Sequence, residues 1–163
     1  MIANRRTLLT GAAAVAALPV YKARAQAKPK IKIGVINDQS GPYRDLNGPT
    51  SVVCTRQAVQ EFAAGDFDVE VLSADNQNKA DVAVAIARQW IDQDGVDLVM
   101  DLAASSAALA VSSLCREKNK IALATSTATS DLTGKACTPN TIHWVFDTYM
   151  EARSTGGAMV KVG

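Results

Sequence analysis

The chain has 163 residues, a length typical of one domain, and its 48% hydrophobic and 20% charged residues are ordinary for a globular protein. The formal net charge is +1, so nothing indicates a nucleic-acid-binding surface, and we expect no nucleic-acid partner. The charge is uneven, because residues 1–27 carry four basic residues and no acidic one, which leaves −3 for residues 28–163.

Residues 1–27 have the pattern of a secretory signal peptide. A basic start at Arg5 and Arg6 precedes an apolar stretch over residues 8–20, and small residues alternate over residues 23–27. The apolar stretch is shorter than the roughly 20 residues that a membrane-spanning helix needs. We expect export to the periplasm with cleavage near Ala27. The arginine pair is twin-arginine-like, and twin-arginine export and ordinary Sec export both remain open.

The predicted elements after the signal alternate between strands and helices. In chain order, the first half holds a strand over Lys30–Asn37, a helix that begins around Pro49 and ends at Gly65, a strand over Val69–Ala74, and a helix over Asp81–Asp94 that Gly95 ends. The second half holds a strand over Asp97–Leu102, a helix capped by Ser105 or Ser106, a strand over Lys120–Thr125, an extended stretch over Thr141–Phe146, and a weaker helix from Asp147.

This alternation indicates an α/β fold, a parallel sheet with helices on both faces. In such sheets ligands bind outside the carboxyl ends of the strands. We therefore expect the loops that follow the first four strands to lie at one edge and to form the ligand-binding side. These loops are residues 38–48, 75–79, 103–106 and 126–133.

The edge loops carry hydroxyls, accessible backbone N–H groups and one aromatic ring. Ser40 and Tyr43 follow the first strand. Ser105 and Ser106 lie at a helix start, where unpaired N–H groups and the helix dipole favour an anion such as a carboxylate. Residues 126–129 add hydroxyls and small side chains that let a ligand approach the backbone. Each residue alone is explained as a cap or a turn, but together at one edge they indicate a site for a small organic acid.

The sequence gives little support for a catalytic site, a cofactor site or a metal site. His143 is the only histidine and lies among apolar residues, which is typical of a structural histidine. G-x-S-x-G, a P-loop, G-x-G-x-x-G and CxxC are all absent, so we expect no catalytic residue, no cofactor and no metal site. Cys54 and Cys115 fall on predicted helices beside apolar residues and are expected to be buried thiols. With Cys137 the cysteines number three, so at least one is free or pairs elsewhere.

Three motifs in this order resemble exported solute-binding proteins of ABC transporters. They are Ile31–Val35 leading into Ser40-Gly41-Pro42, the paired serines Ser105-Ser106, and Ala128–Thr133. The resemblance covers residues 30 to about 160. It is to the type I periplasmic-binding-protein fold, in the branched-chain amino-acid (Leu/Ile/Val-binding) group, whose members close two α/β lobes around a ligand.

This resemblance implies a non-enzymatic protein that captures a small amino acid or organic acid, aromatic acids included, with a membrane permease of an ABC importer as partner. It implies no cofactor. Carried over by position, the ligand-binding residues are Ser40, Tyr43, Ala104, Ser105, Ser106, Ser126, Thr127, Ala128 and Thr129.

The length departs from that family, whose members are more than twice as long. We therefore expect residues 28–146 to be the N-terminal part of the first lobe and residues 147–163 the start of a truncated second lobe. On this interpretation the chain is a fragment, and Met159 and Val160 lie exposed for want of packing partners. The alternatives are an exported single-domain α/β enzyme and a non-functional truncated product.

Overall fold

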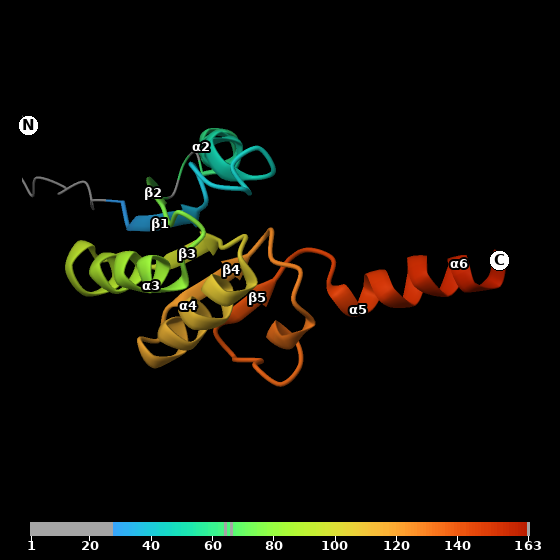
Figure 1. The fold of residues 1–163 in the computed structure, drawn as a ribbon. Helices are drawn as coiled ribbons and strands as arrows, with labels where there is room; N and C mark the ends of the chain where they lie inside the picture. Colours follow the sequence, from blue (N-terminus) through green and yellow to red (C-terminus); the bar gives the residue numbers. More distant parts are fainter. Residues whose placement is uncertain (1–27, 64, 66, 163) are drawn as a thin grey trace, which may run out of the picture.

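The computed structural model describes residues 28–63, 65 and 67–162, so the predicted export signal lies outside the described residues. Five strands form one parallel sheet in the order β2-β1-β3-β4-β5 (Figure 1). The strands are β1 (Lys30–Asn37), β2 (Asp68–Asp75), β3 (Leu98–Asp101), β4 (Ile121–Ala124) and β5 (Thr141–His143). The predicted parallel α/β fold is confirmed.

The bounds of the first four strands agree with the prediction to within one residue. The fifth is shorter than predicted, because it ends at His143 rather than Phe146. The strand stops at His143 because its neighbour β4 ends there. His143 pairs with Ala124, which is the final residue of β4, so no neighbouring strand continues beside residues 144–146.

Helices follow the strands along the described chain. They are α2 (Gly48–Phe62), α3 (Ala80–Gln89) with a π-helical continuation η2 (Trp90–Asp94), α4 (Ser105–Glu117), the 3-10 turn η3 (Ser130–Leu132), and the C-terminal α5 (Thr148–Glu151), η4 (Ala152–Gly156) and α6 (Gly157–Val162). Pro49 stands in the first turn of α2, as predicted. Gly95 ends η2 with a φ of 70°, a left-handed conformation that glycine adopts without strain.

The two faces of the sheet are covered unequally. α3 and α4 pack beside each other on one face, and α2 lies on the other (Figure 1). The main core lies under α3 and α4. It includes the inner face of α4, which carries Ala107, Val111, Leu114 and Cys115. Helices thus cover both faces, but the larger core belongs to one of them.

The face of the sheet that α2 covers is more open than the face under α3 and α4. Val52 is buried against the sheet, but Phe62, ten residues later in the same helix, is 84% exposed. Phe62 lies in the last turn of α2, at the rim of an apolar groove that Ile31, Phe67 and Met100 also line. The described residues do not fill this groove, so the ring stays in contact with solvent.

The cysteines divide between core and surface. Cys115 is buried, as predicted, and burial raises the pKa of its thiol to about 11. Cys54 is exposed, so the prediction for it is wrong. α2 turns Val52 and Thr55 toward the sheet, which places Cys54, two residues after Val52, on the outer side. Cys137 is exposed as well, and all three thiols are free.

The close approach of Trp90 to β1 depends on Gly34. A Cβ atom on Gly34 would lie 2.5 Å from Cε3 of Trp90, well inside contact distance. The Trp90 side chain is 7% exposed and belongs to the main core. The strand therefore needs a residue without a side chain where the indole ring crosses it.

The weak C-terminal helix predicted from Asp147 is confirmed. Asp147 is the N-cap of α5, and its carboxylate accepts a hydrogen bond from the Met150 N–H at 2.7 Å. From there α5, η4 and α6 run away from the sheet (Figure 1). Met159 and Val160 are 69% and 85% exposed, in line with the expectation. None of the helices within the described ranges has the length and apolar character to cross a membrane.

Candidate functional site

The carboxyl ends of β1, β3 and β4 lie side by side. Ile36 pairs with Asp101, and Asp101 pairs with Ala124, so the three strands end at nearly the same level. In the order β2-β1-β3, the chain first moves one way across the sheet and then the other. The change of direction falls between β1 and β3, which is the topological switch point where open α/β sheets bind ligands. The loops after these strands therefore meet at a favourable place.

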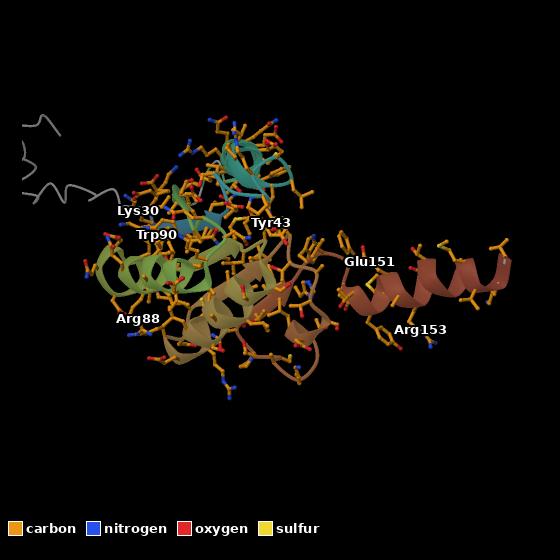
Figure 2. The ribbon with its side chains drawn as sticks, in the orientation of Figure 1. Lys30, Tyr43, Arg88, Trp90, Glu151 and Arg153 are labelled. Carbon is orange, nitrogen blue, oxygen red and sulfur yellow. The ribbon has the colours of Figure 1, made fainter. Side chains whose placement is uncertain are left out.

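Asp38 organises the loop after β1. Its carboxylate is 1% exposed and accepts hydrogen bonds from the N–H groups of Gly41 at 2.7 Å and Tyr43 at 2.9 Å. Gly41 is required here, since a Cβ atom would lie 2.6 Å from both oxygens of Asp38. Tyr43 is 38% exposed, and Figure 2 shows it where the loop after β1 reaches the edge of the sheet.

Ser40 belongs to the β2 side of this edge. Burial alone would raise the pKa of Asp75, but hydrogen bonds from the Ser40 hydroxyl and from the N–H groups of Gln39 and Gln77 bring the pKa below its ordinary value. Asp75 ends β2, which is separated from β3 by β1. Ser40 is thus held apart from the serines that follow β3.

Asp101 links the ends of β1, β3 and β4. Its fully buried carboxylate accepts hydrogen bonds from Asn37 Nδ2 at 2.7 Å, from the Thr125 hydroxyl at 3.4 Å and from the Ser126 hydroxyl. Asp101 and Leu102 have φ values of 81° and 59°. Such left-handed conformations are costly for residues with side chains. The turn redirects the chain from β3 toward the start of α4.

The first turn of α4 differs from the prediction that Ser105 or Ser106 caps it. The N-cap is Ala104, whose backbone is extended and whose carbonyl already accepts a hydrogen bond from Ala108 at 2.9 Å. Ser105 and Ser106 therefore occupy the first two helical positions. Both serines are exposed, whereas Ala104 is 7% exposed. Exposed hydroxyls beside the first N–H groups of a 13-residue helix are suitable donors for a carboxylate.

The residues after β4 have distinct structural contacts. The Thr127 side chain is fully buried, its hydroxyl donates to the Leu102 carbonyl, and its own carbonyl lies 2.5 Å from Nε2 of His143. The Thr129 hydroxyl accepts a hydrogen bond from the Asp131 N–H at 3.3 Å. The hydroxyl of Thr127 thus joins two loops and does not face solvent.

The other two predicted residues of this loop, Ser126 and Ala128, lie nearer the surface. Ser126 is partly exposed and donates to Asp101. The Ala128 carbonyl accepts a hydrogen bond from the Thr148 N–H at 2.7 Å, which joins this loop to the start of α5. The predicted residues after β3 and β4 are therefore brought together, with Tyr43 on the neighbouring loop and Ser40 farther along the edge.

A cavity of about 350 Å³ opens between the start of α2 and the ends of β3 and β4. Its lining comprises Leu46, Asn47, Ser51, Asp101, Thr125, Ser126, Val145 and Phe146. Ser126 is the one predicted site residue among them. Sequence analysis missed Asn47, Ser51 and Asp101, although Asp101 stands near the end of a predicted strand at the ligand-binding edge, and that position was the available signal. Within the described ranges no cluster of side chains could hold a metal ion.

The fold and this edge define a class of protein, the α/β proteins that bind ligands at the carboxyl ends of a parallel sheet. Residues 30–163 match the family of periplasmic binding proteins, and the chain belongs to that family. This is a family of solute-binding proteins rather than of enzymes. Among curated proteins, none matches the chain.

Solved structures agree with the family assignment. The chain is similar to a periplasmic binding protein from Burkholderia mallei (39% identity, TM-score 0.79) and to a branched-chain amino-acid ABC-transporter ligand-binding protein from Burkholderia xenovorans (32%, 0.76). It is also similar to an ABC-transporter solute-binding protein from Rhodopseudomonas palustris solved with 4-hydroxybenzoate (25%, 0.73). Each match covers 82% of this chain and 36% of the other, so the chain spans just over a third of their length.

Proposed function

We propose that this chain is part of the solute-binding component of an ABC importer, which captures a small amino acid or organic acid in the periplasm and delivers it to a membrane permease. The observation that carries the proposal is the meeting of the loops after β1, β3 and β4 at the switch point of the sheet. Membership of the periplasmic-binding-protein family supports the same role. The basic and apolar pattern of residues 1–27 supports export, by the Sec or the twin-arginine route.

In the proposed site, the start of α4 holds the carboxylate of the solute. Ser105 and Ser106 offer exposed hydroxyls, and the first N–H groups of the helix point along its axis toward the same place. The loop of residues 126–129 is joined by the hydrogen bond from Thr127 to Leu102, three residues before Ser105. Tyr43 supplies a ring for the apolar part of the solute. The branched-chain amino-acid group is the narrower form of this proposal.

The proposal also places the boundary between two lobes near residue 147. Residues 28–146 would be the N-terminal part of the first lobe, and residues 147–163 the start of the second. The C-terminal helical segment supports this division, because it leaves the end of β5 and runs away from the sheet (Figure 1). Hinge closure between two such lobes around a ligand is a known way in which binding proteins retain their solute.

Thermal unfolding of the full chain with a panel of amino acids and aromatic acids tests the proposal. A ligand that binds the folded state raises the melting temperature in a concentration-dependent way. In the double variant Ser105→Ala/Ser106→Ala, we expect acids to lose most of this rise. Ser113→Ala, on the exposed side of the same helix, is the matched control and should keep it. Thr127 is not part of the variant, since its hydroxyl holds Leu102. A panel in which no compound shifts the melt would refute the proposal.

A further inference from the structure

In the part of the chain that the structure describes, β5 forms an outer edge of the sheet and pairs with β4 on one side only (Figure 1). The Trp144 N–H donates to the Ala124 carbonyl at 2.8 Å, so Trp144, and every second residue before it in the strand, turns its backbone groups toward β4. The backbone groups of the residues between them point away from the sheet. We infer that this open edge pairs with the same edge of a second copy of the chain, in antiparallel orientation with His143 at the two-fold axis.

The first support is that the sequence at this edge lacks the features by which edge strands avoid pairing, which include charged side chains and proline. Residues 140–146 contain no aspartate, glutamate, lysine or arginine, and no proline or glycine. They are rich in β-branched and aromatic residues, the composition of segments that pair readily between chains. The opposite edge strand, β2, carries Asp68, Glu70 and Asp75. Pairing between copies is therefore favoured at β5 rather than at β2.

The second support is a pair of exposed apolar side chains beside the open edge. The Thr141 hydroxyl is hydrogen-bonded to the Ser112 hydroxyl of α4, so Thr141 faces the α4 side of the sheet. Because side chains alternate along a strand, Ile142 and Trp144 face the other side. On that side α2 lies over β1 and β2, and both side chains remain exposed, Trp144 by 76%. Large apolar side chains exposed together are typical of an interaction surface.

The backbone groups of the edge identify a second copy as the partner, because they are complementary to themselves. In the antiparallel arrangement, the N–H of each His143 meets the carbonyl of the other His143. The N–H of each Val145 then meets the Thr141 carbonyl of the other copy. The Thr141 N–H needs no partner across the axis, since it donates to the Thr138 carbonyl of its own chain at 3.2 Å. One segment thus supplies both sides of the interface, as two-fold symmetry requires.

The side chains are complementary in the same arrangement. Positions 142 and 144 lie equally far from His143, so Ile142 of each copy stands directly opposite Trp144 of the other. A β-branched residue opposite an aromatic residue on a neighbouring strand stabilises a sheet, and the symmetry supplies this pair twice. Two five-stranded sheets become one continuous sheet. The paired segment is short, so we expect a weak dimer, with a dissociation constant of about 1–100 μM. The proposed solute-binding function does not depend on this pairing.

Sedimentation equilibrium of the full chain over a range of concentrations tests the inference. We expect the average mass to rise from 17.2 kDa toward twice that value as the concentration increases. Ile142→Lys and Trp144→Glu should each raise the dissociation constant about tenfold or more, because each removes apolar contacts and places like charges diagonally across the axis. The matched control Val160→Lys, at an exposed apolar residue of α6, should leave the dissociation constant unchanged. A mass that stays at the monomer value up to about 1 mM, or a dimer that neither edge variant weakens, would overturn the inference.

A mixture of the two edge variants tests the antiparallel register. In a mixed dimer, the lysine introduced at position 142 of one chain faces the glutamate introduced at position 144 of the other. The unchanged Trp144 of the first chain faces the unchanged Ile142 of the second. We therefore expect the mixture of Ile142→Lys and Trp144→Glu to dimerise about tenfold more tightly than either variant alone. No gain in affinity on mixing would overturn the pairing about His143.

Amide hydrogen exchange of the unchanged chain keeps the inference testable if a variant does not fold. The His143 N–H should exchange slowly at concentrations where the dimer dominates and rapidly after dilution, because its hydrogen bond forms across the axis. The Trp144 N–H, which donates to Ala124 within one chain, is the internal control and should stay protected at both concentrations. Equal exchange of the His143 N–H at high and low concentration would overturn the inference.

Discussion

Single buried polar side chains determine how the loops meet at the edge of the sheet. Asn37 Nδ2 donates to the Gly48 carbonyl and to Asp101, both at 2.7 Å, and so joins the start of α2 to the end of β3. Thr127 joins the loops after β3 and β4 through its hydroxyl. Because these groups are buried, removing one partner leaves the other without a hydrogen bond, which is costly in the interior. The geometry of the candidate site therefore depends on buried residues as well as on those exposed at the edge of the sheet.

The different exposure of the three cysteine thiols leads to a prediction about their reactivity. We expect Cys54 and Cys137 to react quickly with a thiol reagent under native conditions, and Cys115 to react only after denaturation. Cys115 is buried and its pKa is raised to about 11, so very little thiolate is present at neutral pH, whereas the other two thiols are exposed. Absorbance from a disulfide reagent counts the reacting groups.

Variants assign each reacting thiol. Cys115→Ser should leave the native count at two, and Cys54→Ser should reduce it to one. A native count of three in the unchanged chain would show that α4 does not shield Cys115 and would contradict the packing described above.

At the scale of elements, the packing of the main core can be tested where Trp90 of η2 contacts Gly34 of β1. Gly34→Ala should lower the free energy of unfolding by about 1–3 kcal/mol, because the added methyl group overlaps the Trp90 ring and overpacks the core. Chemical denaturation measures this difference.

The matched control is Gly156→Ala in η4, where an added Cβ would meet nothing within 4 Å. Alanine there should leave the stability unchanged or raise it by up to about 1 kcal/mol, since alanine favours helix more than glycine does. Equal stabilities of the Gly34→Ala variant and the unchanged chain would mean that the indole ring does not lie against β1.

The positions of the strands could be predicted from the sequence because the patterns that indicate a strand are local. Lys30–Asn37 is an apolar run that ends in polar residues, and alternation with helices implies a parallel sheet whose edge loops share one side. The errors for Cys54 and the cap of α4 have another origin. Each depends on which side of a helix meets the sheet, or on where the chain turns before the helix, and these are tertiary properties.

The candidate site was only partly predictable for the same reason. Ser126 was found from its place after a strand. Asp101 and Asn47 are 54 residues apart in the sequence and come to one cavity because α2 returns over the end of β3. The left-handed turn at Asp101 and Leu102 brings the carboxylate to Asn37 and Ser126, and no local pattern indicates such a turn at two residues with side chains.

At the scale of the whole molecule, the sheet with α2, α3 and α4 forms a body from which the C-terminal helical segment projects (Figure 1). Figure 2 shows Arg153 on that segment. Its guanidinium group lies 5.9 Å from the centre of the Tyr149 ring, which belongs to the same segment. Beyond Glu151, every described residue is exposed except Gly157, which is partly exposed. The segment thus makes little contribution to the packed core.

Deleting residues 152–163 should leave the melting temperature of the chain unchanged, because no buried side chain is lost. Differential scanning calorimetry of the two chains at equal concentration measures the effect. The variant Leu114→Ala, which removes a buried side chain from α4, is the positive control and should lower the free energy of unfolding by about 2–5 kcal/mol. A clear fall in melting temperature on deletion would show that the segment packs against the body or against another copy.

The unequal covering of the sheet has a consequence for how the proposed solute would enter. α4 buries six side chains, whereas the buried residues of α2 are Gly48, Val52 and Thr55. Local opening costs least where the fewest apolar groups leave the interior, so α2 should lift from the sheet more readily than α4. Its first turns carry Asn47 and Ser51 of the cavity. Brief excursions of this one helix would admit a small molecule while the hydrophobic layer beneath α3 and α4 stays closed.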